Sequence, residues 1–160
     1  MKNLKELEIG GLSFGLTSGI ITTLGLIVGV DSATNSKLAV IAAILTIAVA
    51  DSLADAFGMY FSEESREDES KKPIWAISLF SFLGKFIFSL LFLIPIVFLD
   101  PNLAIKISIL FGTIIISLLA VYISHRRSRP VFVEVVEHLA LAFIVIFISY
   151  FLGTLAEKII

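Results

Sequence analysis

Five long apolar stretches take up most of this 160-residue chain and restrict what it can fold into. A helix needs about 20 consecutive apolar residues to cross the hydrocarbon core of a bilayer, and each stretch reaches that length. A helix also satisfies its backbone hydrogen bonds within its own segment, as lipid requires. We therefore predict an all-α polytopic membrane protein with one transmembrane domain over residues 1–160. The predicted spans are about 9–30, 38–62, 73–99, 103–124 and 130–157.

The composition agrees with a membrane location and excludes several functions. Charged residues make up 16% of the chain and the mean hydropathy is +1.01, far from the values of an ordinary soluble domain. The chain has no cysteine, which excludes disulfides, iron–sulfur clusters and thiolate metal sites. The net charge of -2 and the lack of a basic run interleaved with aromatic residues argue against a nucleic-acid partner.

Lysine and arginine residues near the span ends predict the orientation, because these residues favour the cytoplasmic side of a membrane. Eight lie on the side of the amino terminus and three on the other side. We therefore expect a cytoplasmic amino terminus and an outer carboxyl terminus, in the cell membrane of a prokaryote. The eight are Lys2, Lys5, Arg66, Lys71, Lys72, Arg126, Arg127 and Arg129, and the three are Lys37, Lys106 and Lys158.

Asp51, Asp55, Met59 and Glu63 follow one another at intervals of four residues along the second predicted span. Residues four apart lie on one side of a helix, about 6 Å apart along its axis. A carboxylate near the bilayer centre costs about 2.5–3.5 kcal/mol on insertion scales, and such residues often mark ion pathways. We interpret the series as a ladder that passes a cation inward from Glu63 and Met59 to the two aspartates.

The ligand types narrow the predicted ion. Carboxylates suit Mg, Ca and Mn, whereas a thioether is softer, so the mixture favours a first-row divalent ion such as Fe²⁺ or Mn²⁺. Methionine also fills gaps in apolar interfaces, which leaves packing as the alternative for Met59. Without a cation, two carboxylates one turn apart in a low dielectric are not expected to stay ionised together, so at least one proton is expected there. Displacement of that proton by the metal predicts metal–proton exchange, with no permanently bound cofactor.

Lys85 supports a competing interpretation, because it lies near the middle of the third span at a depth similar to that of Asp51. An ion pair between them would make the acidic series a structural device, although one lysine neutralises only one of two aspartates. The alternatives are thus a non-transporting scaffold with internally paired charges, or a proton or cation channel. No enzyme is predicted, because the paired-aspartate motifs Asp-Gly-x-x-Ala-Arg and Gly-x-Gly-Asp do not occur.

A second candidate metal site lies at the start of the fifth span. Glu134, Glu137 and His138 have i, i+3 and i, i+4 spacing, and a Glu-x-x-His helix can contribute to a di-metal site in a bundle. The alternative is a set of interfacial charges that favour the start of a helix. The remaining ligands of such a site would have to come from Glu63, Glu64 or Glu67.

The first span contains two Gly-x-x-x-Gly pairs, Gly15/Gly19 and Gly25/Gly29. Small residues four apart let another backbone approach closely within lipid. The pairs predict close packing, either against a partner subunit or against helices of the same chain. We expect a homodimer with Gly15 and Gly19 as the closest points, because five short helices would struggle to enclose a polar path alone.

Two segments resemble one known family. The first span reads Gly-Leu-Ser-Phe-Gly-Leu-Thr-Ser-Gly from Gly11 to Gly19, similar to the Gly-Leu-Ser-Asp-Gly-Leu opening of the vacuolar iron transporter family. The segment from Ala54 to Glu63 resembles that family's Ala-Gly-Ala-x-Ser-Met-x-x-x-Glu stretch. The resemblance implies a five-span homodimer whose first two helices line a path, and which exports Fe²⁺ or Mn²⁺ from the cytosol in exchange for protons. The loop over residues 64–72 is too short for the cytosolic metal-binding domain of many members.

The resemblance also implies roles for particular residues. Met59 matches the methionine of the family's path, Asp51 falls where the family often has a glutamate, and Glu63 matches the acid at the helix end. Phe14 replaces the aspartate of the family's first helix, which departs from the pattern. Asp55 stands where the family usually has glycine, and we expect it to supply the missing carboxylate from the second helix.

Overall fold

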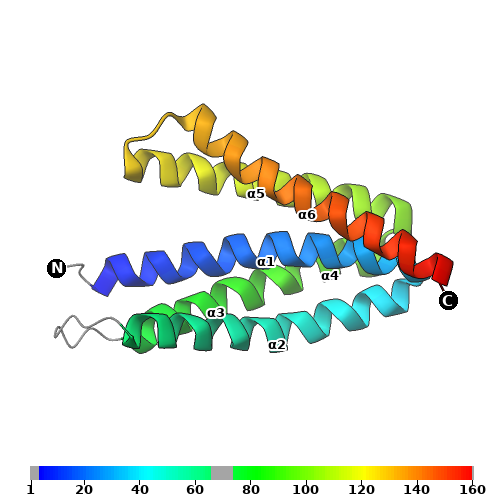
Figure 1. The fold of residues 1–160 in the computed structure, drawn as a ribbon, viewed down its shortest axis with the longest axis horizontal. Helices are drawn as coiled ribbons and strands as arrows, with labels where there is room; N and C mark the ends of the chain where they lie inside the picture. Colours follow the sequence, from blue (N-terminus) through cyan, green and yellow to red (C-terminus); the bar gives the residue numbers. More distant parts are fainter. Residues whose placement is uncertain (1–3, 66–73, 160) are drawn as a thin grey trace.

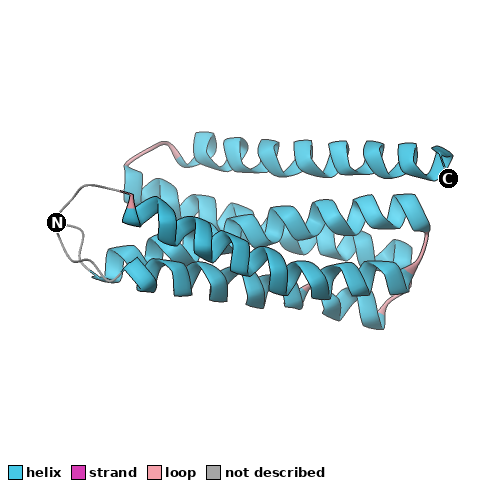
Figure 2. Ribbon diagram, turned by 60° about the horizontal axis from the view of Figure 1, so that its bottom comes forward, coloured by secondary structure: helices cyan, strands magenta, loops and turns pink. Residues whose placement is uncertain are grey.

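The computed structural model of the protein describes residues 4–65 and 74–159. Six helices make up nearly all of these residues. The helices are α1 (Leu4–Thr34), α2 (Lys37–Glu64), α3 (Ile74–Leu91), α4 (Leu93–Phe98), α5 (Pro101–Arg127) and α6 (Val131–Ile159). Figure 1 shows them side by side in an elongated bundle, and Figure 2 shows short loops between α1 and α2, between α4 and α5 and between α5 and α6. The predicted all-helical class is confirmed, since the described ranges contain no strand.

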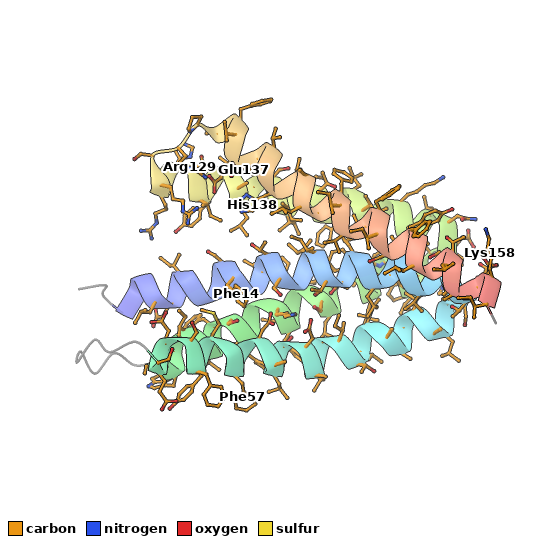
Figure 3. All side chains as sticks on the ribbon, viewed as in Figure 1. Phe14, Phe57, Arg129, Glu137, His138 and Lys158 are labelled. Atoms are coloured by element: carbon orange, nitrogen blue, oxygen red, sulfur yellow. The ribbon has the colours of Figure 1, made fainter. Side chains whose placement is uncertain are left out.

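Five helical segments are long and apolar enough to cross a membrane, as predicted. The start of α1 and the end of α6 lie at opposite ends of the bundle (Figure 1). Figure 3 places Arg129 at the end where α1 starts and Lys158 at the other end. Lys2, Arg66, Lys71 and Lys72 lie outside the described residues. The five segments are Leu7–Thr34, Lys37–Glu64, Ile74–Phe98, Pro101–Arg127 and Val131–Ile159.

Local sequence signals account for the turns between the long helices. Ser36 caps α2, because its hydroxyl accepts a hydrogen bond of 3.3 Å from the backbone N–H of Ala39. Pro101 opens α5, where a missing N–H costs no helical hydrogen bond. Ser128 ends α5 in a left-handed conformation (φ 52°), which turns the chain towards α6.

The third span is one predicted segment but two helices, α3 and α4, separated at Phe92. Pro95 explains the break, because proline has no N–H and its ring clashes with the carbonyl of the residue four positions earlier, here Leu91. The Phe92 N–H bonds instead to the Ser89 carbonyl, three residues back, at 3.3 Å. The chain therefore bends within the span rather than at its end.

Helix α1 is the centre of the bundle and lies between the α2–α3 pair and the α5–α6 hairpin (Figure 1). Its glycines allow this central position. On the α3 side, an added Cβ on Gly15 would clash with the backbone carbonyl of Ser81, and one on Gly19 would lie 3.0 Å from the Cα of Lys85. Only a hydrogen atom fits at these positions, so the two backbones touch along their length.

The second glycine pair brings α6 against the other side of α1. An added Cβ on Gly25 would lie 2.8 Å from the Val145 side chain, and one on Gly29 3.3 Å from the Ser149 carbonyl oxygen. Both Gly-x-x-x-Gly pairs therefore pack against helices of the same chain. This corrects the expectation that Gly15 and Gly19 are the contact with a second subunit, because α3 covers them.

The apolar core lies in the half of the bundle away from the start of α1. Its buried members include Ile27 on α1, Ile44 on α2, Phe92 next to α3 and Ile96 on α4. In that half the α5–α6 hairpin packs on α1, whereas towards the other end the hairpin diverges from it (Figure 1). The apolar core thus fills one half of the bundle. The polar residues of α1, α2 and α3 lie next to the core, towards the end where α1 starts.

Candidate cation site

Lys85 is a fully buried lysine that binds both aspartates predicted to hold a cation. Its side chain is 1% exposed. The ammonium Nζ forms ion pairs with Asp51 Oδ2 and, at 2.8 Å, with Asp55 Oδ2. The ion pair of the competing interpretation is therefore formed, and it extends to the second aspartate. The aspartates are partly exposed, 33% for Asp51 and 20% for Asp55, so the acidic side of the cluster is the more accessible side.

Ser18 on α1 completes the cluster. Its hydroxyl donates a hydrogen bond of 2.7 Å to Asp55 Oδ2 and accepts one of 3.0 Å from Lys85 Nζ. Ser18 was not among the predicted site residues, although its position one turn after Phe14, between Gly15 and Gly19, was a usable signal. The first helix thus contributes a hydroxyl to the cluster, one turn beyond the position where the resembling family has a carboxylate.

The glycine face of α1 brings these groups together. Because Gly19 has no side chain, the backbone of α3 at Lys85 lies directly against α1, next to Ser18. Asp51 and Asp55 lie one turn apart on α2, so both reach the same ammonium. One turn further along, Thr23 donates a hydrogen bond of 2.9 Å to the buried Ser89 hydroxyl, which extends the polar contact between α1 and α3.

Two carboxylates and one ammonium leave the cluster with a formal charge of −1. A charged group inside a membrane-spanning bundle is costly unless it has a partner, and three groups in one hydrogen-bonded set reduce that cost. The ammonium takes the place that a proton or cation was predicted to take between the aspartates. The remaining negative charge allows the cluster to attract a further positive ion.

The other members of the acidic series do not join the cluster. Met59 and Glu63 lie further along α2 and are half-buried, and Glu64 is exposed at the helix end. Among residues 4–65 and 74–159, no three acidic or histidine side chains are placed to hold a metal ion together. The structure thus brings Asp51 and Asp55 to one ammonium, whereas Met59 and Glu63 lie nearer the end of α2.

The second predicted metal site is an arginine–glutamate cluster. Glu134 is 1% exposed and accepts a hydrogen bond of 3.2 Å from Arg129 Nη1, which also bonds to Glu137 at 3.3 Å. His138 donates through Nδ1 to the Glu134 backbone carbonyl at 2.8 Å. These residues lie beside the turn that joins α5 to α6, and α1 lies between them and α2 (Figures 1 and 3).

The di-metal site predicted at the start of α6 is therefore not formed in the described residues. Glu63 and Glu64 belong to α2, on the far side of α1, and Glu67 lies outside the described residues. The alternative of interfacial charges fits Glu137, which is exposed. Glu134 instead stabilises the turn between α5 and α6, because it binds Arg129 and, at 3.7 Å, Arg127.

Replacing Glu134 with alanine is expected to lower the free energy of unfolding by about 1–2 kcal/mol. The change removes a buried carboxylate from two arginines, and their partial exposure to solvent limits the loss. Glu137→Ala is the matched control, because Glu137 binds the same Arg129 but is half-exposed. It should change stability by less than about 0.5 kcal/mol. Thermal unfolding of the purified variants, followed by circular dichroism, measures both, and equal losses would contradict the role of Glu134.

The fold and the site together define an all-helical membrane protein with five helices able to span a bilayer and an ion cluster shared by α1, α2 and α3. Comparison of the chain with protein-family models, curated proteins and solved structures finds no match. The resemblance to the vacuolar iron transporter family therefore stays a prediction from two segments of sequence.

Proposed function

We propose that this protein is a membrane transporter of divalent first-row metal ions, Fe²⁺ or Mn²⁺, which exports them from the cytosol in exchange for protons. The observation that carries the proposal is the shared cluster of Asp51, Asp55 and Lys85. Two carboxylates within a membrane-spanning bundle hold one ammonium and keep a net negative charge. Intramembrane charges of this kind usually serve an ion or proton pathway.

A metal ion would bind where the carboxylates are partly exposed and would compete with Lys85 for them. The ammonium binds as a single positive charge, whereas a divalent ion brings two, so the ion gains more from the same pair of carboxylates. When the metal leaves, the Lys85 ammonium returns to both carboxylates, and protons move through the site in the opposite direction. This sequence of events couples metal movement to protons without a permanently bound cofactor.

The apolar core favours a carrier over an open channel. Beyond the cluster, each of the three helices continues with buried apolar residues, represented by Ile27 on α1 and Ile44 on α2, with Phe92 at the end of α3. Because α2 runs opposite to α1 and α3, these residues all lie towards the same end of the bundle. A carrier closed on one side of its ion site has this arrangement.

The proposal includes a homodimer. Asp51 is 33% exposed, and a carboxylate facing lipid is unfavourable, so a second subunit against α1 and α2 would shield it. The family resemblance implies the same arrangement, with the first two helices lining the path. The partners proposed are thus the metal ion, membrane lipid and a second copy of the chain.

Metal flux into proteoliposomes tests the function. We expect Fe²⁺ or Mn²⁺ uptake with opposite movement of protons, reported by a pH-sensitive dye. Asp51→Asn and Asp55→Asn each remove a charged ligand worth about 2–3 kcal/mol, so uptake at low ion concentration should fall about 30- to 150-fold. Glu137→Gln, an exposed acid of the other cluster, is the matched control and should transport normally. Absence of flux for every divalent ion would overturn the proposal.

A scaffold role is the second candidate, because the pairing of Lys85 with both aspartates also satisfies a purely structural cluster. The two functions predict different results for one variant. If the cluster is structural, the double variant Lys85→Met with Asp55→Asn keeps every activity of the protein, since it removes one positive and one negative charge. If the cluster binds the transported ion, the same variant loses flux while it remains folded.

A further inference from the structure

Three oxygen atoms converge on one positively charged atom in the bundle. Lys85 Nζ lies 3.0 Å from Ser18 Oγ and 2.8 Å from Asp55 Oδ2, and it also contacts Asp51 Oδ2. The oxygens come from α1 and α2, and the ammonium reaches them from α3. Such an arrangement surrounds the ammonium in the way that oxygen ligands surround a bound cation.

The geometry points to a cation site formed by Ser18, Asp51 and Asp55, with the Lys85 ammonium as a tethered cation that occupies it until the transported ion enters. This inference rests on the proposed transport function and adds the ligand set. Lysine suits the role because its charge sits on a flexible four-carbon stem, which can withdraw without movement of the helix. The ion and the ammonium compete for the same oxygens, since both need them to offset the cost of burial.

The two cations approach the oxygens from different sides. The Lys85 side chain is 1% exposed, so the ammonium comes from the buried side of the cluster. Asp51 and Asp55 are 33% and 20% exposed, so an ion reaches them at their open edge, along the path that α1 and α2 line in the proposed homodimer. Entry of the ion therefore does not require Lys85 to leave first, and the ion can displace it directly.

The ligand set also selects among ions. All three ligands are oxygen atoms, which Mn²⁺ accepts readily, whereas softer ions favour sulfur and nitrogen. Met59, the soft ligand expected from the sequence, lies one turn from Asp55 along α2, about 6 Å along the helix axis. The structure therefore assigns Mn²⁺, an oxygen-preferring divalent ion, as the preferred first-row substrate of the proposed carrier, with Ser18 as a ligand that affects the choice.

A single cysteine tests the position of Ser18, because the chain has no cysteine of its own. Ser18→Cys replaces a hydroxyl by a thiol, a soft ligand, at the inferred site. Binding of Mn²⁺ to the purified full-length protein in lipid nanodiscs is followed by electron paramagnetic resonance, with Cd²⁺ added as the soft competitor. We expect Cd²⁺ to displace Mn²⁺ from Ser18→Cys at concentrations at least about tenfold lower than from the unmodified protein.

The matched control is Thr17→Cys. Thr17 is the neighbouring residue on α1, and its hydroxyl bonds to the Ser13 backbone carbonyl at 2.9 Å. A thiol there should leave the Mn²⁺ to Cd²⁺ preference unchanged. If Ser18→Cys does not fold, Ser18→Ala serves instead and should weaken Mn²⁺ binding about tenfold, since it loses one of three ligands.

Lys85→Gln should strengthen Mn²⁺ binding, because it removes the competing ammonium.

The outcomes separate this inference from the transport function. A Cd²⁺ preference that is the same for Ser18→Cys, Thr17→Cys and the unmodified protein would exclude Ser18 as a ligand and overturn the inference, even where Asp51→Asn still lowers metal flux. Weaker Mn²⁺ binding in Lys85→Gln would exclude competition by the lysine and overturn it as well. Absence of divalent-ion flux from the unmodified protein, in contrast, would overturn the transport function itself.

Discussion

Replacing Lys85 with methionine is expected to lower the free energy of unfolding by about 3 kcal/mol, the lower end of the range for removing one member of a buried ion pair. Methionine keeps an unbranched side chain of similar length against Gly19, so the packing between α1 and α3 is largely preserved. What the variant loses is the positive charge, and Asp51 and Asp55 then face each other without the ammonium that binds both.

Unfolding of the variant in mixed micelles measures this effect, and two further variants separate its causes. Lys106→Met, on the exposed surface of α5, should change stability by less than about 0.5 kcal/mol. The double variant Lys85→Met with Asp55→Asn should recover at least half of the lost stability, because only one carboxylate remains unpaired. Mn²⁺ should stabilise Lys85→Met more than the unmodified protein. A Lys85→Met protein as stable as the original would show that the ion cluster does not hold the three helices together.

Replacing Gly15 with alanine is expected to be nearly as damaging, with a loss of about 2–3 kcal/mol. The new Cβ would clash with the carbonyl oxygen of Ser81 and lie 2.9 Å from its carbon and 3.0 Å from the Lys85 backbone nitrogen. These are backbone atoms of a helix, which cannot rotate away as a flexible side chain can. The two helices must separate, and the movement draws Lys85 away from Ser18.

Gly10→Ala is the control for this change, because a Cβ at Gly10 meets no atom within 4 Å. Alanine is favoured over glycine within a helix by about 1 kcal/mol, so Gly10→Ala should be neutral or slightly stabilising. The difference between the two variants isolates the steric effect. Equal stability of the two proteins would mean that α1 and α3 are not in close contact along this face. Loss of metal flux in Gly15→Ala alone would link that contact to the ion site.

Much of the fold could be predicted because lipid imposes a strong constraint on sequence. The five spans follow from apolar length alone, and the structure places their ends within a few residues of the predicted ones. The pairing of Lys85 with Asp51 was one of two interpretations for a related reason, since a charge at that depth needs a partner and few are available. The break at Phe92 was not predicted, although Pro95 within the last turns of the span indicated it.

It was harder to predict which residues contact each other than which residues are buried. The pattern of Gly15 and Gly19 predicts close packing but does not tell whether the partner is α3 or another subunit, because both offer the same backbone surface. Spacing on α6 suggested a metal site at Glu134, whereas the arginines of the preceding turn bind that carboxylate. Each error has the same origin, because spacing within one helix does not identify the residues of a neighbouring helix.

By itself, the sequence determined that the chain is an all-helical membrane protein and that two aspartates lie deep within it, because apolar length and charge burial are properties of each segment alone. Only the tertiary structure decided that Lys85 binds both aspartates and that Ser18 bonds to Asp55 and Lys85. Those contacts depend on how closely α1, α2 and α3 approach one another and in what register, and that is set by packing between residues far apart in the chain.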